Sequence, residues 1–251
     1  MSKLVDLMVL EYTLTWRLLI LGAVYAVMFA IYVASLRTTA GIFPVHESGI
    51  IYIQDAGSGY MNLSIFLVGF IGYVYSKSLA GQISSGLLKT ILCYPIRRKQ
   101  LLLAKLATNY LILMLAGLLP VFYSKLLYNV EAKALAVLLL AFALKLFFYS
   151  SVSIVISLLS REPLVSLVSS ILILYAVEAA PSFLWSIHME KAARIIGINY
   201  IVTALYKVIY SENGFGALAD LDAVGTVIFY TTLTAIFTAT AFFLFEKMDL
   251  D

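Results

Sequence analysis

The chain has few charged residues, and this shortage restricts what it can be. Asp, Glu, Lys and Arg make up 12% of its 251 residues, whereas hydrophobic residues make up 63%. Soluble domains carry about a quarter charged residues. A soluble domain of this length has too little interior to bury so much apolar surface. The composition therefore predicts a membrane protein.

Cysteine and histidine are too scarce for several kinds of site. Cys93 is the only cysteine, so no internal disulfide can form. The single cysteine also excludes a multi-cysteine metal site, and two histidines with scattered external carboxylates do not supply three or four converging ligands. We therefore expect no metal site. The net charge of +3 is mild and gives no reason to expect nucleic acid as a partner.

The sequence also lacks the phosphate-binding loop of an ATPase. Gly81 and Gly86 have the glycine spacing of the G-x-x-x-x-G-K-S/T motif, but Leu87 and Leu88 follow in place of Lys and Ser or Thr. If ATP drives this protein, the nucleotide and its magnesium must be bound by another subunit. No cofactor is expected on this chain.

A membrane hydrolase is a weak alternative. Gly57-Ser58-Gly59 with His46 or His188 supplies a nucleophile and a base, which such an enzyme needs within hydrogen-bonding reach. Small residues in an external loop explain the pattern equally well. We therefore expect no catalytic residue.

Six apolar stretches approach the length of about 20 residues that a helix needs to cross a bilayer. In chain order they cover residues 18–36, 61–75, 106–123, 134–159, 164–187 and 223–245. No internal repeat or soluble domain interrupts them. The expected fold is an all-α polytopic membrane protein with six transmembrane helices, in which residues 1–251 form one domain.

Two further helical regions are expected at the membrane surface. Residues 1–17 mix apolar and charged residues at near-helical spacing, which predicts an amphipathic helix in the interface or, alternatively, an extension of the first span. Within the external region 182–222, apolar residues recur at helical spacing until Gly214 and Gly216 break the pattern. That region is expected to hold short re-entrant helices, with an ordinary surface helix as the alternative.

The orientation follows from the Lys and Arg residues in the loops, because cytoplasmic loops carry an excess of them. The loop between the second and third spans contains Lys77, Lys89, Arg97, Arg98, Lys99 and Lys105, and the next contains only Lys125 and Lys133. The first of these loops is therefore cytoplasmic. With six spans, both termini also lie in the cytoplasm, and the protein is placed in the cell membrane.

Lys145 and Glu178 are the only charges deep in the expected spans. An unpaired charge there costs at least about 2.5–3.5 kcal/mol, so both side chains should face protein or water. They lie at similar depth in consecutive spans, which makes an ion pair feasible. Such a pair would either handle substrate or protons or be purely structural. A structural pair, or a lysine extending toward the interface, is the simpler interpretation.

The cytoplasmic segment 80–105 has a helix–break–helix pattern. Leu87, Leu88, Ile91 and Leu92 form one apolar face, and Pro95 ends the turn before the basic residues Arg97 and Arg98. A helix of this kind lies along the membrane and can act as a lever. Alternatively, anionic lipid holds it through the basic cluster, at about 1 kcal/mol per charge.

This segment resembles the membrane subunits of type-two ATP-binding-cassette exporters. Their loop typically reads an acidic residue and Gly-Thr-Leu, then Leu-Leu, Pro-Val/Ile-Ser/Arg-Arg and Leu-Leu-Gly-Lys. The matching residues are Gly86-Leu87-Leu88, Ile91-Leu92, Pro95-Ile96-Arg97-Arg98 and Leu102-Leu103-Ala104-Lys105. The interfacial helix, the six spans, the external region and the ending Phe245 to Leu250 also resemble this family. The chain departs from it at Ser84, Ser85 and Leu87.

The resemblance implies a permease subunit without enzymatic activity that forms the export path. Its partners would be a separate ATPase, a second permease subunit of the same or a homologous kind, and membrane lipid. The segment that contacts the ATPase would comprise Gly86, Leu87, Leu88, Ile91, Leu92, Pro95, Arg97 and Arg98. The substrate stays open. The main alternative is an ion-coupled secondary transporter, for which Lys145, Glu178 and Pro181 are the only indications.

Overall fold

The computed structural model describes residues 64–94, 96–128, 132–197, 200–201, 205 and 221–248. The expected interfacial helix 1–17, the first span 18–36, Pro95 and most of the external region after residue 197 lie outside these residues. Within the described part, every regular element is a helix, as the sequence predicts. The elements are α4 (Ser64–Tyr75), the π-helix η1 (Ser76–Ala80), α5 (Gly81–Ser84), α6 (Leu87–Leu92), α7 (Arg98–Tyr128), α8 (Ala132–Ser160), α9 (Pro163–Ser186), α10 (Glu190–Ile196) and α13 (Leu221–Lys247).

Three of these helices are long and apolar enough to cross a membrane. They are the segments Leu139–Ser160 of α8, Pro163–Ser186 of α9 and Val224–Lys247 of α13. Each coincides closely with a span expected from the sequence. The protein is therefore a multi-pass membrane protein built from α-helices. α4 and α7 overlap the expected second and third spans.

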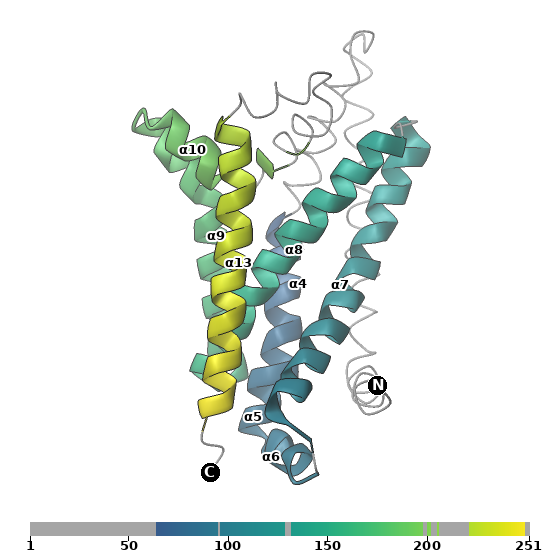
Figure 1. Ribbon diagram of the computed structural model, residues 1–251, viewed down its shortest axis with the longest axis vertical. Helices are drawn as coiled ribbons and strands as arrows, with labels where there is room; N and C mark the ends of the chain where they lie inside the picture. The colour runs from purple at the N-terminus through teal and green to yellow at the C-terminus, as the bar shows by residue number, and fades with distance from the viewer. Residues whose placement is uncertain are drawn as a thin grey trace.

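α8 is the central helix of the described part. In the most apolar stretch of α8, 72% of the residues are buried inside the molecule, compared with 17% in the corresponding stretches of α9 and α13. α8 packs against α4, α7, α9 and α13 and runs obliquely across the bundle (Figure 1). α9 and α13 therefore turn most of their apolar surface outward, as helices in contact with lipid do.

The connections bring several helix ends together at one end of the molecule, which we call the α6 end. α5, α6, the turn between α8 and α9 and the C-terminal end of α13 lie there, whereas α10 lies at the opposite end (Figure 1). The hydroxyl of Ser76, in η1, donates a hydrogen bond to the carbonyl of Pro163 at the start of α9. This bond fixes η1 against the α8–α9 turn.

The α8–α9 turn is only two residues long, so the two helices run antiparallel as a hairpin. Arg161 has a left-handed φ of 55°. Glu162 is extended, as a residue before proline must usually be, and Pro163 occupies the first position of α9, where its missing N–H removes no helical hydrogen bond.

Gly86 provides the break in the segment between α4 and α7. Its φ of 70° is left-handed, and a Cβ added there would have no atom within 4 Å. The backbone conformation, rather than lack of space, therefore favours glycine at this position. α6 follows at once and ends at Leu92.

The external region begins differently from its sequence-based boundary. α9 extends to Ser186 and contains Pro181 without ending there. The next described helix, α10, is short and packs against α9 and α13. The start of region 182–222 is thus the last turn of α9 followed by one short helix.

Candidate functional site

The structure joins Lys145 of α8 and Glu178 of α9 in an ion pair. The Lys145 Nζ lies 2.9 Å from Oε1 of Glu178, and the two side chains are 1% and 10% exposed. The hairpin explains this meeting, because the two residues lie at equal distance from the turn in antiparallel helices. Each charge thereby avoids the cost of lying unpaired within the membrane.

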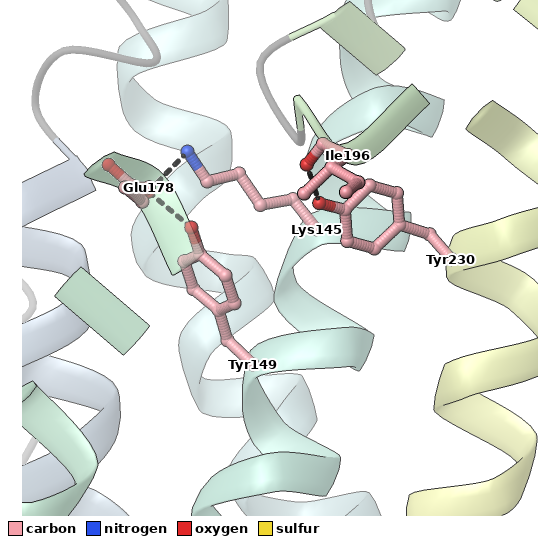
Figure 2. Close-up of polar contacts among 5 residues, drawn as sticks. All are labelled: Lys145, Tyr149, Glu178, Ile196 and Tyr230. Carbon is pink, nitrogen blue, oxygen red and sulfur yellow. Dashed lines mark hydrogen bonds and ion pairs between the residues drawn. The ribbon is translucent and has the colours of Figure 1, made fainter. Parts of the chain in front are cut away.

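Tyr149 is a third member of this cluster and was not predicted from the sequence. Its hydroxyl donates a hydrogen bond to the same Glu178 oxygen that Lys145 approaches. The Lys145 ammonium also lies 5.4 Å from the centre of the Tyr149 ring. Figure 2 shows both side chains directed at the carboxylate. The only signal in the sequence was the spacing of four residues, which puts Tyr149 one helical turn from Lys145.

Beside this cluster, aromatic side chains pack α8 against α13. Phe148 packs edge-on against Tyr230 and Phe237 of α13, with ring centres 5.0 and 6.2 Å apart. The Tyr230 hydroxyl donates to the carbonyl of Ile196 and so ties α13 to the end of α10 (Figure 2). The cluster is thus packed between α8 and α9, and Tyr230 of α13 lies near enough to interact electrostatically with Glu178.

A polar stripe continues from the ion pair to the α6 end. On α8, Lys145, Tyr149, Ser153 and Ser157 recur every four residues. On α9, the same step in the opposite direction gives Glu178, Leu174, Ser170 and Ser166, and Ser157 Oγ lies 2.7 Å from Ser166 Oγ. All four serines are fully buried. Small side chains at this spacing let the two backbones approach closely within a membrane.

α4 covers the stripe from a third side. A Cβ placed on Gly72 would lie 3.3 Å from the Cβ of Ser170, so the two helices are close at this point. Tyr75, further along α4, is fully buried and lies next to Ser150 of α8. The polar stripe therefore lies among three helices, whereas the rest of α9 is apolar and largely exposed.

A second buried polar cluster lies near the α6 end. The Nζ of Lys105, on α7, donates to the Ser78 carbonyl at 3.2 Å and to Oε1 of Gln82 at 2.6 Å. Asn109, one turn further, donates to Ser78 Oγ at 2.7 Å. Both α7 side chains are fully buried. Lys105 therefore lies within α7 and holds the π-helix η1, so it is not one of the loop cations from which the orientation is predicted.

The expected apolar face of α6 is divided in the structure. Leu88 and Ile91 are buried in the core of the same chain, and Leu92 packs partly against that core. Leu87 is 38% exposed and Tyr94, just after the helix, is 64% exposed. Leu87, Thr90 and Tyr94 lie on one side of the helix, which we call the outer face of α6. Any partner that docks on α6 meets this face.

The basic residues after α6 are also divided. Arg97 is exposed. The Arg98 guanidinium donates to the carbonyls of Glu246 and Met248 at the end of α13, at 3.1 and 2.5 Å. Lys99 forms an exposed ion pair with Glu246 at 3.1 Å. These contacts satisfy helix-terminal carbonyls and connect the α6 segment to the last span.

Comparisons with protein-family models and with curated proteins gave no match for this chain. Its function is therefore inferred from its own residues and their arrangement.

Proposed function

We propose that this chain is the membrane subunit of a type-two ATP-binding-cassette exporter. In this proposal it forms the export path with six spans, keeps both termini in the cytoplasm and binds a separate ATPase that carries ATP and magnesium. A second permease subunit completes the assembly. The proposal rests first on the segment from Gly86 to Lys105, whose residues resemble the family's loop.

The structural observation that supports this proposal best is that α6 has one side buried in the core and the other side exposed. α6 is anchored by Leu88 and Ile91 in the core of the chain, so it cannot swing freely away from the bundle. Its outer face still presents a leucine and a tyrosine. A helix fixed on one side and exposed on the other is suited to receive a partner and pass on its movement.

The connections of α6 give such a movement a path into the bundle. The Arg98 bonds join the segment to the end of α13, and the Ser76 bond joins η1 to the start of α9. Lys105 holds η1 from α7. A displacement of α6 would therefore act on several helices at their shared end rather than on one alone.

The test is assembly with the ATPase on purification from the native membrane. We expect the chain to purify with an ATP-hydrolysing subunit, and Leu87→Asp with Tyr94→Asp to abolish this association, because carboxylates would enter a desolvated contact without matching charges. Lys89→Gln is the matched control, since Lys89 is exposed on α6 but turned away from the outer face. Leu88→Asp would not test docking, because Leu88 belongs to the core of the chain itself.

An ion-coupled secondary transporter is the second candidate, and the Lys145–Tyr149–Glu178 cluster favours it. Charged groups inside membrane spans commonly mark ion or substrate paths. The two candidates differ in what drives transport. Uptake by the purified chain alone in vesicles with an ion gradient and no ATP would overturn the exporter proposal.

A further inference from the structure

Three buried hydroxyl groups lie between the two ends of the polar stripe. They belong to Ser150 and Ser153 on α8 and to Ser170 on α9, and each residue is 1% exposed or less. None of the three has a hydrogen-bond partner among the residues that the structure describes. The Tyr75 hydroxyl also lacks a well-formed hydrogen bond among these residues, and it interacts with the neighbouring hydroxyl of Ser150. These groups sit between the Lys145–Glu178 pair and the Ser157–Ser166 pair.

Other serines of α8 behave differently. Ser151 donates to the carbonyl of Phe148 at 2.7 Å, and Ser160 donates to that of Ile156 at 2.9 Å. Serine in a membrane helix usually satisfies its hydroxyl in this way. Ser150 and Ser153 are on the same helix, but their hydroxyls do not make this bond. The difference is therefore specific to these two positions, because Ser160, two turns from Ser153 on the same side of α8, makes the usual bond.

Leaving such hydroxyls unsatisfied is unfavourable. A buried polar group without a partner costs about 1–3 kcal/mol, and several occur here within a few helical turns. Buried water relieves this cost where two to four polar groups surround each molecule. Ser153 and Ser170 face each other across the hairpin, since their neighbours Ser157 and Ser166, one turn nearer the α8–α9 turn, are in hydrogen-bonding contact. This arrangement supplies the partners that a water molecule needs.

We infer that Ser150, Ser153 and Ser170 hold a short file of water molecules that connects the Lys145–Glu178 pair with the aqueous phase at the α8–α9 turn. The file spans about 24 Å, the rise over the sixteen residue steps from Glu162 to Glu178 at about 1.5 Å each. It ends at the exposed residues Arg161 and Glu162. The outward side of α9 is apolar, with Leu172, Ile173 and Tyr175 exposed, so the file is confined to the side that faces α8 and α4.

This assignment gives the intramembrane pair a role beyond holding two helices together. Water in contact with Glu178 lowers the cost of burying its charge and gives small polar solutes access from the α6 end. The inference depends on neither an ATPase partner nor an ion gradient. Its test can therefore fail or succeed independently of the proposed function.

The test measures contact with water at single thiols in the full chain. Cys93 is replaced by serine, and Ser153→Cys, Ser170→Cys and Ser151→Cys are introduced one at a time. Exchange of the thiol proton for deuterium in heavy water is followed by the infrared S–H stretch. Ser151→Cys is the matched control, because it makes the same change on the same helix at a buried serine away from the stripe.

We expect the thiols at 153 and 170 to exchange on the order of ten times faster than the thiol at 151, where exchange needs local opening of the packing. Equal exchange at all three positions, whether fast or slow, would overturn the inference.

A second measurement uses the unaltered chain. Hydroxyl radicals generated from water should oxidise buried Tyr75 and Tyr149, which border the file, and spare buried Phe142 on α8. Protection of both tyrosines would also overturn it.

Discussion

Glu178 receives an ammonium and a phenol hydroxyl at one carboxylate oxygen. Both donors come from the same face of α8, one turn apart, so a single side chain of α9 is held by two residues of its neighbour. Inside a membrane this arrangement satisfies a charge that lipid cannot solvate. The position of α9 along α8 is therefore determined at this residue.

Removing one charge of the Lys145–Glu178 pair is expected to destabilise the protein more than removing both charges. Lys145→Met or Glu178→Gln alone leaves a buried charge and should destabilise the protein by about 3–5 kcal/mol, whereas the double variant Lys145→Met with Glu178→Gln should lose less stability than the two single losses combined. Reversible unfolding of the detergent-solubilised protein measures these values.

The exposed pair Lys99–Glu246 is the control for this cycle. Its side chains are 62% and 56% exposed, so the same substitutions there should change stability by less than about 1 kcal/mol. Strictly additive losses at Lys145 and Glu178 would show that the buried charges do not interact.

At the scale of single elements, η1 depends on a residue from another helix. A π-helix is rare and often occurs at functional sites. Here Lys105 and Asn109 of α7 bond to Ser78 and Gln82, which lie in and just after η1. The local geometry at the start of the α6 segment is thus stabilised from α7.

Replacing Lys105 should loosen the α6 segment before it unfolds the bundle. Lys105→Met removes two charge-assisted hydrogen bonds, each worth about 1.5–3 kcal/mol, and leaves their acceptors buried. We expect faster tryptic cleavage after Lys89 and Arg97 and lower overall stability. The control is Lys77→Met, which removes an exposed lysine from η1 itself. Unchanged cleavage in Lys105→Met would show that η1 holds its shape alone.

The sequence predicts the long helices better than it predicts the polar contacts. The sequence predicts the spans 134–159, 164–187 and 223–245, because apolar composition over about 20 residues is a strong signal. Ser153, Ser157, Ser166 and Ser170 gave no signal, because serine is tolerated in apolar runs and only the hairpin register reveals that they face each other. The sequence also does not show that Leu88 and Ile91 are buried while Leu87 is exposed, because this depends on which side of α6 the core occupies.

At the scale of the whole molecule, α6 and the α9–α10 turn lie at opposite ends (Figure 1). The excess of Lys and Arg near α6 predicts that this end lies in the cytoplasm, even without Lys105. Exposed Cys93 should therefore react with an impermeant thiol reagent only after the cells are permeabilised. In a Cys93→Ser chain, Ser186→Cys should react from outside without permeabilisation. Reversed labelling would overturn the orientation.

The two-residue turn between α8 and α9 also has a consequence for biosynthesis. A growing chain that released α8 into lipid before α9 was made would leave Lys145 without its carboxylate, at a cost of at least about 2.5–3.5 kcal/mol. Glu178 emerges 33 residues after Lys145, within the same helical hairpin. We therefore expect the two helices to leave the insertion machinery together, as one unit whose charges are neutralised before it meets the bilayer.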